Sequence, residues 1–238
     1  SCNPAIGGIA KGQLVREIDA LGGAMARVTD AATLQFRMLN RRKGPAVHSP
    51  RAQCDKLCYQ RAMRRELETQ PDLRLHQAEA CDLLTAGDCI SAVETQFGER
   101  FAAKAVVLAT GTFLAGKLHY GMRSFPGGRA GDPAAIALSA ALRDRLGLRL
   151  GRLKTGTPPR LQAAGIDFAA MIEQPSEPAD GFSFFPEDQA QPRTVRRNLS
   201  CYLSQTTAAT ADIVRRNLDQ SPLYGGVIEG IGARYCPS

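Results

Sequence analysis

The fold prediction starts from the stretch AVVLATG, residues 105–111. Its first five residues form a continuous apolar run, which is typical of a parallel strand buried on both faces of a sheet. Thr110 and Gly111 follow at the expected end of that strand. A small residue and a glycine there let a dinucleotide approach the backbone closely, although a simple tight turn would use the same residues. We therefore expect an α/β fold that contains a parallel sheet.

The residues before this run predict helices followed by a small antiparallel sheet. Apolar residues recur at helical spacing over 12–21 and over 51–70, where Pro71 ends the pattern. The Gly22-Gly23 pair ends the first helix or kinks it into a segment that runs to Asp30. Alternating residues and turn signals predict strands over 33–39, 73–78, 81–86, 89–96 and 100–104, with Gly87-Asp88 as a hairpin turn.

The second half of the chain has weaker patterns. A glycine-rich loop over 125–133 opens onto a helix expected over 134–146, and strands are expected over 148–154 and 201–205. Residues 173–193 are rich in Pro, Glu, Asp and Gln, which predicts an exposed loop or insertion. Residues 207–218 predict a helix with Thr or Ser available to cap its first turn.

The composition is that of a folded protein. The chain has 238 residues, of which 44% are hydrophobic and 22% charged, and these values argue against a disordered or collagen-like chain. An apolar run of about 18 residues would predict a transmembrane helix, and the sequence contains none. The first residues also lack the pattern of a secretory signal. The net charge of +7 favours polyanions such as nucleic acid as partners. The bias is mild, because the arginines are dispersed along the chain.

Two of the seven cysteines stand apart from the others. An odd number at irregular spacing implies no disulfide framework, and the absence of a second Cys or His pair at metal-ligand spacing argues against a metal site. Most of the thiols are expected to be small buried apolar groups. Cys2 and Cys236 lie in Gly/Pro-rich turn sequence, where reactive groups are more often found. A helix that begins near Lys11 would lower the pKa of Cys2.

Ten segments resemble one known family, and they run in register over essentially the whole chain. They are SCNPAIGGIAKG (1–12), EIDALGG (17–23), QFRMLN (35–40), KGPAV (43–47), RAQCDK (51–56), AVVLATGTFLAGK (105–117), GGRAGDP (127–133), GRLKTGTPPR (151–160), NLDQSPLYGGVIEGIG (217–232) and RYCPS (234–238). They are similar to the tRNA uridine 5-carboxymethylaminomethyl modification enzymes, the MnmG or GidA family. Ala10, Ala135 and Ala233 depart from that family's pattern, and Ala135 leaves only a backbone contact at a position where a Ser can meet the flavin.

The resemblance implies a fold and a domain layout. The expected fold is an FAD-binding, Rossmann-like parallel-sheet domain with a β meander over 1–150, and part of an inserted second α/β domain for nicotinamide or substrate over 151–238. The family's first strand and its GGGxAGxEAA-type glycine loop are absent from the sequence. We therefore expect this chain to be an internal fragment, truncated also at its C-terminal side.

The resemblance also implies an activity. Members of this family bind FAD, use NADH and methylene-tetrahydrofolate, and modify C5 of the wobble uridine of certain tRNAs. They act in the cytoplasm with the GTPase MnmE, as a homodimer within a heterotetramer. The alternatives are the folate- and FAD-dependent tRNA uridine-54 C5-methyltransferase, which shares part of the SCNPAIGG motif, and a non-catalytic fragment that only binds tRNA or a partner.

Site residues follow from the matched motifs. The resemblance implies that Cys2 and Cys236 are the catalytic pair, with Lys154 or His48 as the next candidates for the second role. The backbone at Ala80 matches a contact to the adenine side of FAD, and Thr110 and Gly111 are expected near the same cofactor. The start of the nicotinamide-binding stretch is matched by Gly232, Ala233, Arg234, Tyr235, Cys236, Pro237 and Ser238.

Overall fold

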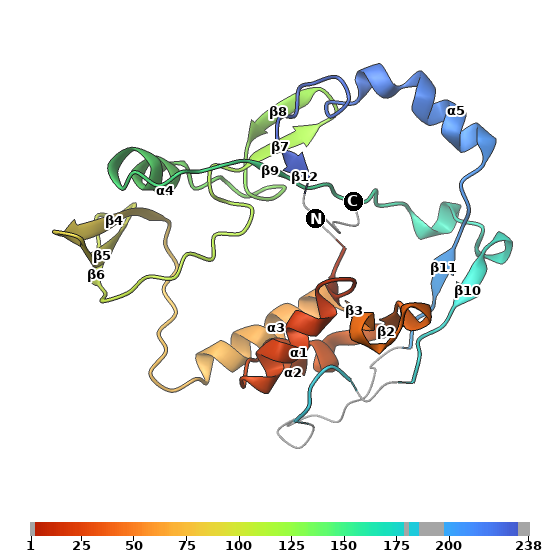
Figure 1. Cartoon of the computed structure of the whole chain (residues 1–238), viewed down its shortest axis with the longest axis horizontal. Coiled ribbons are helices and arrows are strands. Elements are labelled where there is room, and N and C mark those ends of the chain that lie inside the picture. Colours follow the sequence, from red (N-terminus) through yellow and green to blue (C-terminus); the bar gives the residue numbers. More distant parts are fainter. Residues whose placement is uncertain (1–2, 179–180, 186–197, 233–238) are drawn as a thin grey trace. The chain divides into compact units, whose positions relative to one another are not determined.

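The computed structural model describes residues 3–178, 181–185 and 198–232 (Figure 1). The chain divides into two compact units, each of which is made of segments that are distant in sequence. The helical unit contains the described residues of Cys2–Leu75 and Gly156–Thr206. The meander unit contains His76–Thr155 and the described residues of Thr207–Arg234. The domain boundary that we place near residue 150 stays a prediction.

The helical unit consists of a three-stranded sheet and three helices. Strands β1 (Ala5–Gly7), β3 (Ser49–Cys54) and β2 (Thr33–Leu39) lie in the order β1-β3-β2, and both pairings are antiparallel. Helices α1 (Gly12–Ala20), α2 (Met25–Ala32) and α3 (Lys56–Glu68) lie together beside the sheet (Figure 1). The expected helices over 12–21 and to Asp30, and the strand over 33–39, are confirmed. The buried core comprises Val15, Ala26, Ala32, Phe36, Ala52, Cys54 and Phe182.

The helix expected over 51–70 begins five residues later, at Lys56. Residues 49–54 form β3 instead, and its burial alternates as in a strand, with Ala52 and Cys54 in the core. Asp55 separates the two elements because its carboxylate accepts a hydrogen bond from the N–H of Cys58 at 3.0 Å. This N-cap fixes the start of α3.

The stretch 173–193 is not simply an exposed loop. Its first residues belong to β10 (Ile172–Gln174), which pairs with β11 (Cys201–Leu203) in an antiparallel ladder. Phe182 has no exposed surface and packs edge-on against Phe36, with ring centroids 5.6 Å apart. The prediction was wrong here because one apolar anchor outweighs the polar composition around it.

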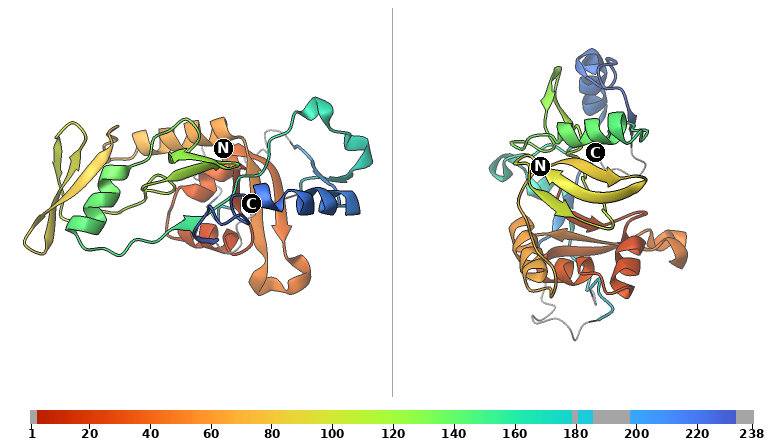
Figure 2. Two further views of the ribbon diagram at one scale, coloured as in Figure 1. Left: turned by 90° about the horizontal axis from the view of Figure 1, so that it is seen from above. Right: turned by 90° about the vertical axis from the view of Figure 1, so that its left-hand side faces the viewer.

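The meander unit is built around the sheet β4-β5-β6. Strands β4 (Ala80–Ala86), β5 (Cys89–Thr95) and β6 (Arg100–Ala102) pair antiparallel, which confirms the hairpin around Gly87. Helix α4 (Ile136–Ala140) continues into a π-helical turn (Ala141–Arg145) and lies against the sheet (Figure 2). Leu83, Leu138 and Leu142 form the core between them.

Smaller elements complete both units. In the meander unit, β7 (Lys117–Tyr120) and β8 (Arg123–Pro126) form a hairpin, and β9 (Leu153–Lys154) pairs in parallel with β12 (Ile231–Gly232). Helix α5 (Ala208–Arg216) starts with a capping box between Thr207 and Thr210, as the sequence predicts. Single 3-10 turns occur at Arg41–Lys43, Pro45–Val47, Ala163–Gly165, Phe168–Ala170 and Leu218–Gln220.

The strand expected over 105–109 does not form. Val107 is 91% exposed and Leu108 44% exposed, and the described residues place no strand beside them. An apolar run becomes a strand only where neighbouring strands satisfy its backbone groups. The strand expected over 73–78 is also absent, and that over 148–154 is reduced to β9. The mixed α/β class is confirmed, but among the strands of the described parts only β9 and β12 pair in parallel, beside one isolated parallel bridge between Leu114 and Ala135.

Candidate functional site

The described part of the SCNPAIGG motif is held tightly by β3. The N–H of Gly8 donates to the carbonyl of Pro50 at 2.8 Å, and the carbonyl of Pro4 accepts from the N–H of Cys54 at 2.7 Å. Gly7 has φ +80°, and a Cβ there would lie 2.2 Å from the Pro50 carbonyl oxygen. Only glycine fits this position, so the backbone of the motif is fixed by packing.

Helix α1 begins where the sequence predicts. The N–H groups of Lys11 and Gly12 both donate to the Gly8 carbonyl, at 3.0 and 2.8 Å. The first turn has no side-chain cap and no acidic residue, so its positive end is not offset by a carboxylate in that turn. Cys2 lies outside the described residues, and its activation by this helix end stays a prediction.

The sheet of the helical unit has a polar face opposite its helices. Alternation along β2 and β3 directs Phe36 and Ala52 into the core. It therefore directs Gln35, Arg37, Arg51 and Gln53 to the other side, which we call the polar sheet face. In the register of β2 and β3, Arg37 lies directly opposite Arg51, and Gln35 lies opposite Gln53.

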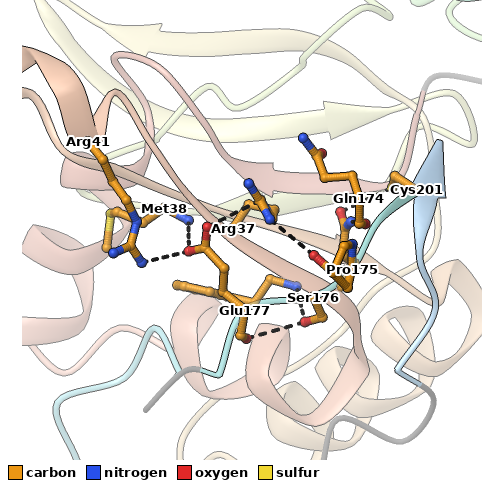
Figure 3. A network of polar contacts seen from close by, with 10 residues as sticks. Arg37, Met38, Arg41, Gln174, Pro175, Ser176, Glu177 and Cys201 are labelled. Carbon is orange, nitrogen blue, oxygen red and sulfur yellow. Dashed lines mark hydrogen bonds and ion pairs between the residues drawn. The ribbon is translucent and has the colours of Figure 1, made fainter. Parts of the chain in front are cut away.

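The carboxylate of Glu177 binds several residues on and beside β2 (Figure 3). Its carboxylate accepts from the N–H of Met38 at 3.0 Å and from Arg41 at 2.7 Å, and it lies 3.3 Å from Nε of Arg37. Partial burial raises the pKa of Glu177, but the Met38 N–H and the guanidiniums of Arg41 and Arg37 outweigh it, so the pKa is lowered overall. Glu177 is therefore an anion that balances part of the positive charge on β2.

The free edge of β2 is covered by residues from the same stretch. The N–H of Glu177 donates to the Phe36 carbonyl at 2.9 Å, and the Ser176 hydroxyl accepts from the N–H of Phe36 at 3.0 Å. Buried Gln35 donates to the Gln174 carbonyl at 2.7 Å and accepts from the Cys201 thiol at 3.0 Å. These bonds fix the position of the polar sheet face.

The meander unit contains the residues expected to contact FAD. Ala80 is half-buried at the start of β4 and packs against the Leu83–Leu138–Leu142 cluster. Leu114, three residues after Gly111, packs against the same cluster. Gly111 has φ +56° in a turn closed by the Phe113 N–H and the Thr110 carbonyl at 3.1 Å, and a Cβ on Gly111 would meet no atom within 4 Å. The positive φ of this turn therefore favours glycine at position 111, and no side chain at that position hinders the approach of a ligand to the backbone.

A pocket of about 450 Å³ lies beside this turn. Its wall is formed by Ala115, Gly116, Lys117, Ser124, Phe125, Pro126, Ile136 and Arg152. A Cβ on Gly116 would lie 2.4 Å from the Thr112 carbonyl oxygen and 2.5 Å from that of Gly127. The glycines thus let the TGTFLAG and GGRAG segments pack against each other, and Arg152 donates to the Ala115 carbonyl of the first segment at 3.3 Å.

Gly232 lies in β12, directly opposite Lys154 of β9. The Cε atom of half-buried Lys154 is 4.0 Å from the position of a Cβ on Gly232. The structure thus brings the KTGTPPR segment beside the start of the stretch that leads to RYCPS. Residues 233–238, which include Cys236 and the other expected nicotinamide contacts, lie outside the described residues.

The sequence was compared with known families and solved structures. The family described as Glucose inhibited division protein A matches residues 1–238. The chain belongs to this GidA family. It is 47% identical to Aquifex aeolicus GidA in its form I crystal, with a TM-score of 0.87, and 43% identical to the same protein in form II, with a TM-score of 0.83. Both matches cover 100% of this chain but only 40% and 38% of the Aquifex chain, which agrees with the expectation of a piece of a longer protein.

Of the five described cysteines of this GidA-family chain only Cys54 is buried, so the expectation that most of the thiols are buried is wrong. Burial, with Asp30 nearby, raises the pKa of Cys54 to about 12, which keeps this thiol protonated and inert. His48 contacts the Arg41 carbonyl at 3.2 Å, and His76 lies 3.1 Å from Glu99. No helix in the described part of this chain is long and apolar enough to cross a membrane.

Sequence reasoning missed the residues that shape the polar sheet face. Arg51 was read as the first residue of a helix, although alternation over 49–54 could have identified a strand. The role of Glu177 was missed because the composition of the stretch 173–193 predicts an exposed loop. Its contacts join residues about 140 positions apart, and no local pattern reports such a contact.

Proposed function

We propose that this chain is part of an FAD-dependent tRNA-modifying enzyme that acts with the GTPase MnmE. The reaction adds a (carboxymethyl)aminomethyl group to C5 of wobble uridine 34, with methylene-tetrahydrofolate as the one-carbon donor and NADH as the reductant. The observation that carries the proposal is the GidA-family match over residues 1–238, within which both cysteine motifs are retained.

The chemistry explains the need for a thiol. C5 of uracil is a poor nucleophile, and addition of a thiolate to C6 turns C5 into an enolate-like carbon that attacks the one-carbon unit. A base then removes the C5 proton, and the electron pair expels the thiolate and restores the C5–C6 double bond. We assign these two roles to Cys2 and Cys236 without specifying which thiol attacks.

The proposal places one wall of the FAD site in the meander unit. The open backbone at Gly111, the adjoining Thr110 and the start of β4 at Ala80 are suited to main-chain contacts with a dinucleotide. Residues 232–238 would begin the nicotinamide site. FAD, when bound, supplies the hydride-transfer chemistry of the reaction.

The tRNA substrate accounts for the basic net charge, because Lys and Arg side chains bind RNA phosphates. The proposal includes a homodimer, its heterotetramer with MnmE, and a cytoplasmic location. These features come from the family resemblance.

The deciding experiment is nucleoside analysis of tRNA from cells that lack the full-length protein and from cells complemented with it. Loss and recovery of the modified wobble uridine would support the proposal. Loss of 5-methyluridine at position 54 would instead identify the folate-dependent methyltransferase. An unchanged nucleoside profile would leave only a binding role.

A further inference from the structure

Two arginines face each other across the polar sheet face. Arg37 on β2 and Arg51 on β3 are direct partners in the antiparallel register, which places their Cα atoms about 4.5–5.5 Å apart. Like charges in directly opposed positions destabilise a sheet unless something neutralises them. The pair therefore needs an anion on this face.

The two guanidiniums are neutralised unequally. Arg37 lies 3.3 Å from Glu177 and donates to the Pro175 carbonyl at 3.2 Å. The side chain of Arg51 forms no hydrogen bond or ion pair with any described residue, and its Nε is buried without an acceptor. A buried N–H that lacks an acceptor is rare in native proteins, and a missing ligand is one explanation for it.

The surrounding charges leave an excess of positive charge. Glu177 is the one carboxylate that contacts Arg37 and Arg41 within the described part of the chain, and it does not contact Arg51. The 3-10 turn Arg41–Lys43 extends the basic surface beyond the end of β2.

We propose that Arg51 binds a backbone phosphate of the tRNA, with Arg37 beside it and the Arg41–Lys43 turn following the next part of the RNA. This inference rests on the proposed function. A guanidinium offers paired N–H donors to a phosphate, and the two terminal nitrogens of Arg51, which bond to no described residue, would supply them. A row of cations suits a chain of phosphates better than a single small anion. The site adjoins the described part of the SCNPAIGG motif, because Gly7 and Arg51 are register partners.

The test is tRNA affinity of the full-length protein as a function of salt. Arg51→Gln should weaken binding several-fold at low salt and reduce the slope of log K against log salt by about one, because one phosphate contact is lost. The matched control is Arg61→Gln, which removes the same charge from an exposed position on α3. The control should keep the parental slope, and flavin absorbance should be unchanged in both variants.

Two further variants keep the test decisive. Arg51→Lys retains the charge but not the two-pronged donor, so it should keep the slope and lose part of the affinity. Glu177→Gln removes the competing anion and should tighten tRNA binding. An unchanged slope in Arg51→Gln, or an equal loss in Arg61→Gln, would overturn the proposed phosphate site. Failure of the parent protein itself to bind tRNA would instead overturn the proposed function.

Discussion

Asp30 on α2 binds the backbone of Phe182, with Oδ1 accepting the Phe182 N–H at 2.7 Å, although the two residues are 152 positions apart. Its second oxygen accepts the N–H of Ser183 at 3.0 Å. Asp19 completes the arrangement by accepting the Phe184 N–H at 2.6 Å and the Ser183 hydroxyl at 3.0 Å. Two buried carboxylates thus hold residues 182–184 against the core of the helical unit.

Replacement of Asp30 by Ala should destabilise the full-length protein by roughly 3 kcal/mol, because two buried N–H groups lose their acceptor. Thermal unfolding should show a clearly lowered midpoint. The control is Asp212→Ala, which breaks an exposed ion pair with Arg215 on α5 and should cost less than about 0.5 kcal/mol. Equal midpoints for the two variants would contradict the anchoring role of Asp30.

Substitutions at Gly7 and Gly8 distinguish the free-energy cost of a strained backbone conformation from the cost of overpacking. Both have positive φ, +80° and +98°, but a Cβ at Gly7 would lie 2.2 Å from the Pro50 carbonyl oxygen, whereas one at Gly8 would meet no atom within 4 Å. Gly8→Ala should cost about 1 kcal/mol of backbone strain, and Gly7→Ala should add an overpacking cost of about 1–3 kcal/mol. Denaturation of the two full-length variants measures the difference, and a smaller loss in Gly7→Ala would contradict the described packing.

Glu177 predicts a loss of stability in acid. Its pKa in the folded protein lies below the ordinary value of 4.5, so the ionised carboxylate binds its partners more strongly than the protonated form does. That contribution is fully present above the ordinary pKa and is lost as the pH falls through the lowered folded pKa. The difference in unfolding midpoint between the parent and Glu177→Gln should therefore shrink from pH 7 to pH 3. A difference that is constant with pH would show that Glu177 does not titrate in this way.

Local patterns predicted the elements that depend on local contacts. The α1 helix, β2, the Gly87 hairpin and the Thr207 cap each follow from periodicity or from a residue beside the element. The anchoring of Phe182 and the covered edge of β2 depend on partners more than 130 residues away, so no sequence window could reveal them. The candidate cysteines came from motif resemblance, whereas Arg51 became a candidate only through its strand register and its unbonded Nε.

A substitution in the apolar run at 105–109 tests whether this run forms a buried strand in the full-length protein. Val107 is 91% exposed, so Val107→Asp should leave the stability of the 238-residue chain unchanged. If the full-length protein contains the buried parallel strand that the sequence predicts, the same variant should cost it several kcal/mol, about 3 or more, because an unpaired charge is then buried. Equal tolerance in the two proteins, measured by their unfolding midpoints, would argue against a strand there.

The cysteine assignment has the sharpest chemical test. Cys2→Ser and Cys236→Ser in the full-length protein should each abolish uridine modification and leave FAD absorbance and folding intact, because a serine hydroxyl is far less acidic than a thiol. The control is Cys54→Ser. This thiol is 3% exposed and its pKa is raised to about 12, so the variant should lose stability but not chemistry.

The readout is nucleoside analysis of tRNA from cells in which each variant is the only copy. Normal levels of the modified wobble uridine with both cysteines replaced would exclude them as the catalytic pair. Loss with only one replaced would show that another group performs the second step. Lys154 would then be tested first, because β9 places it directly opposite Gly232, at the start of the stretch that carries Cys236. Lys154→Met should in that case abolish modification, whereas Lys154→Arg, which keeps the charge but is a far weaker base, should not restore it.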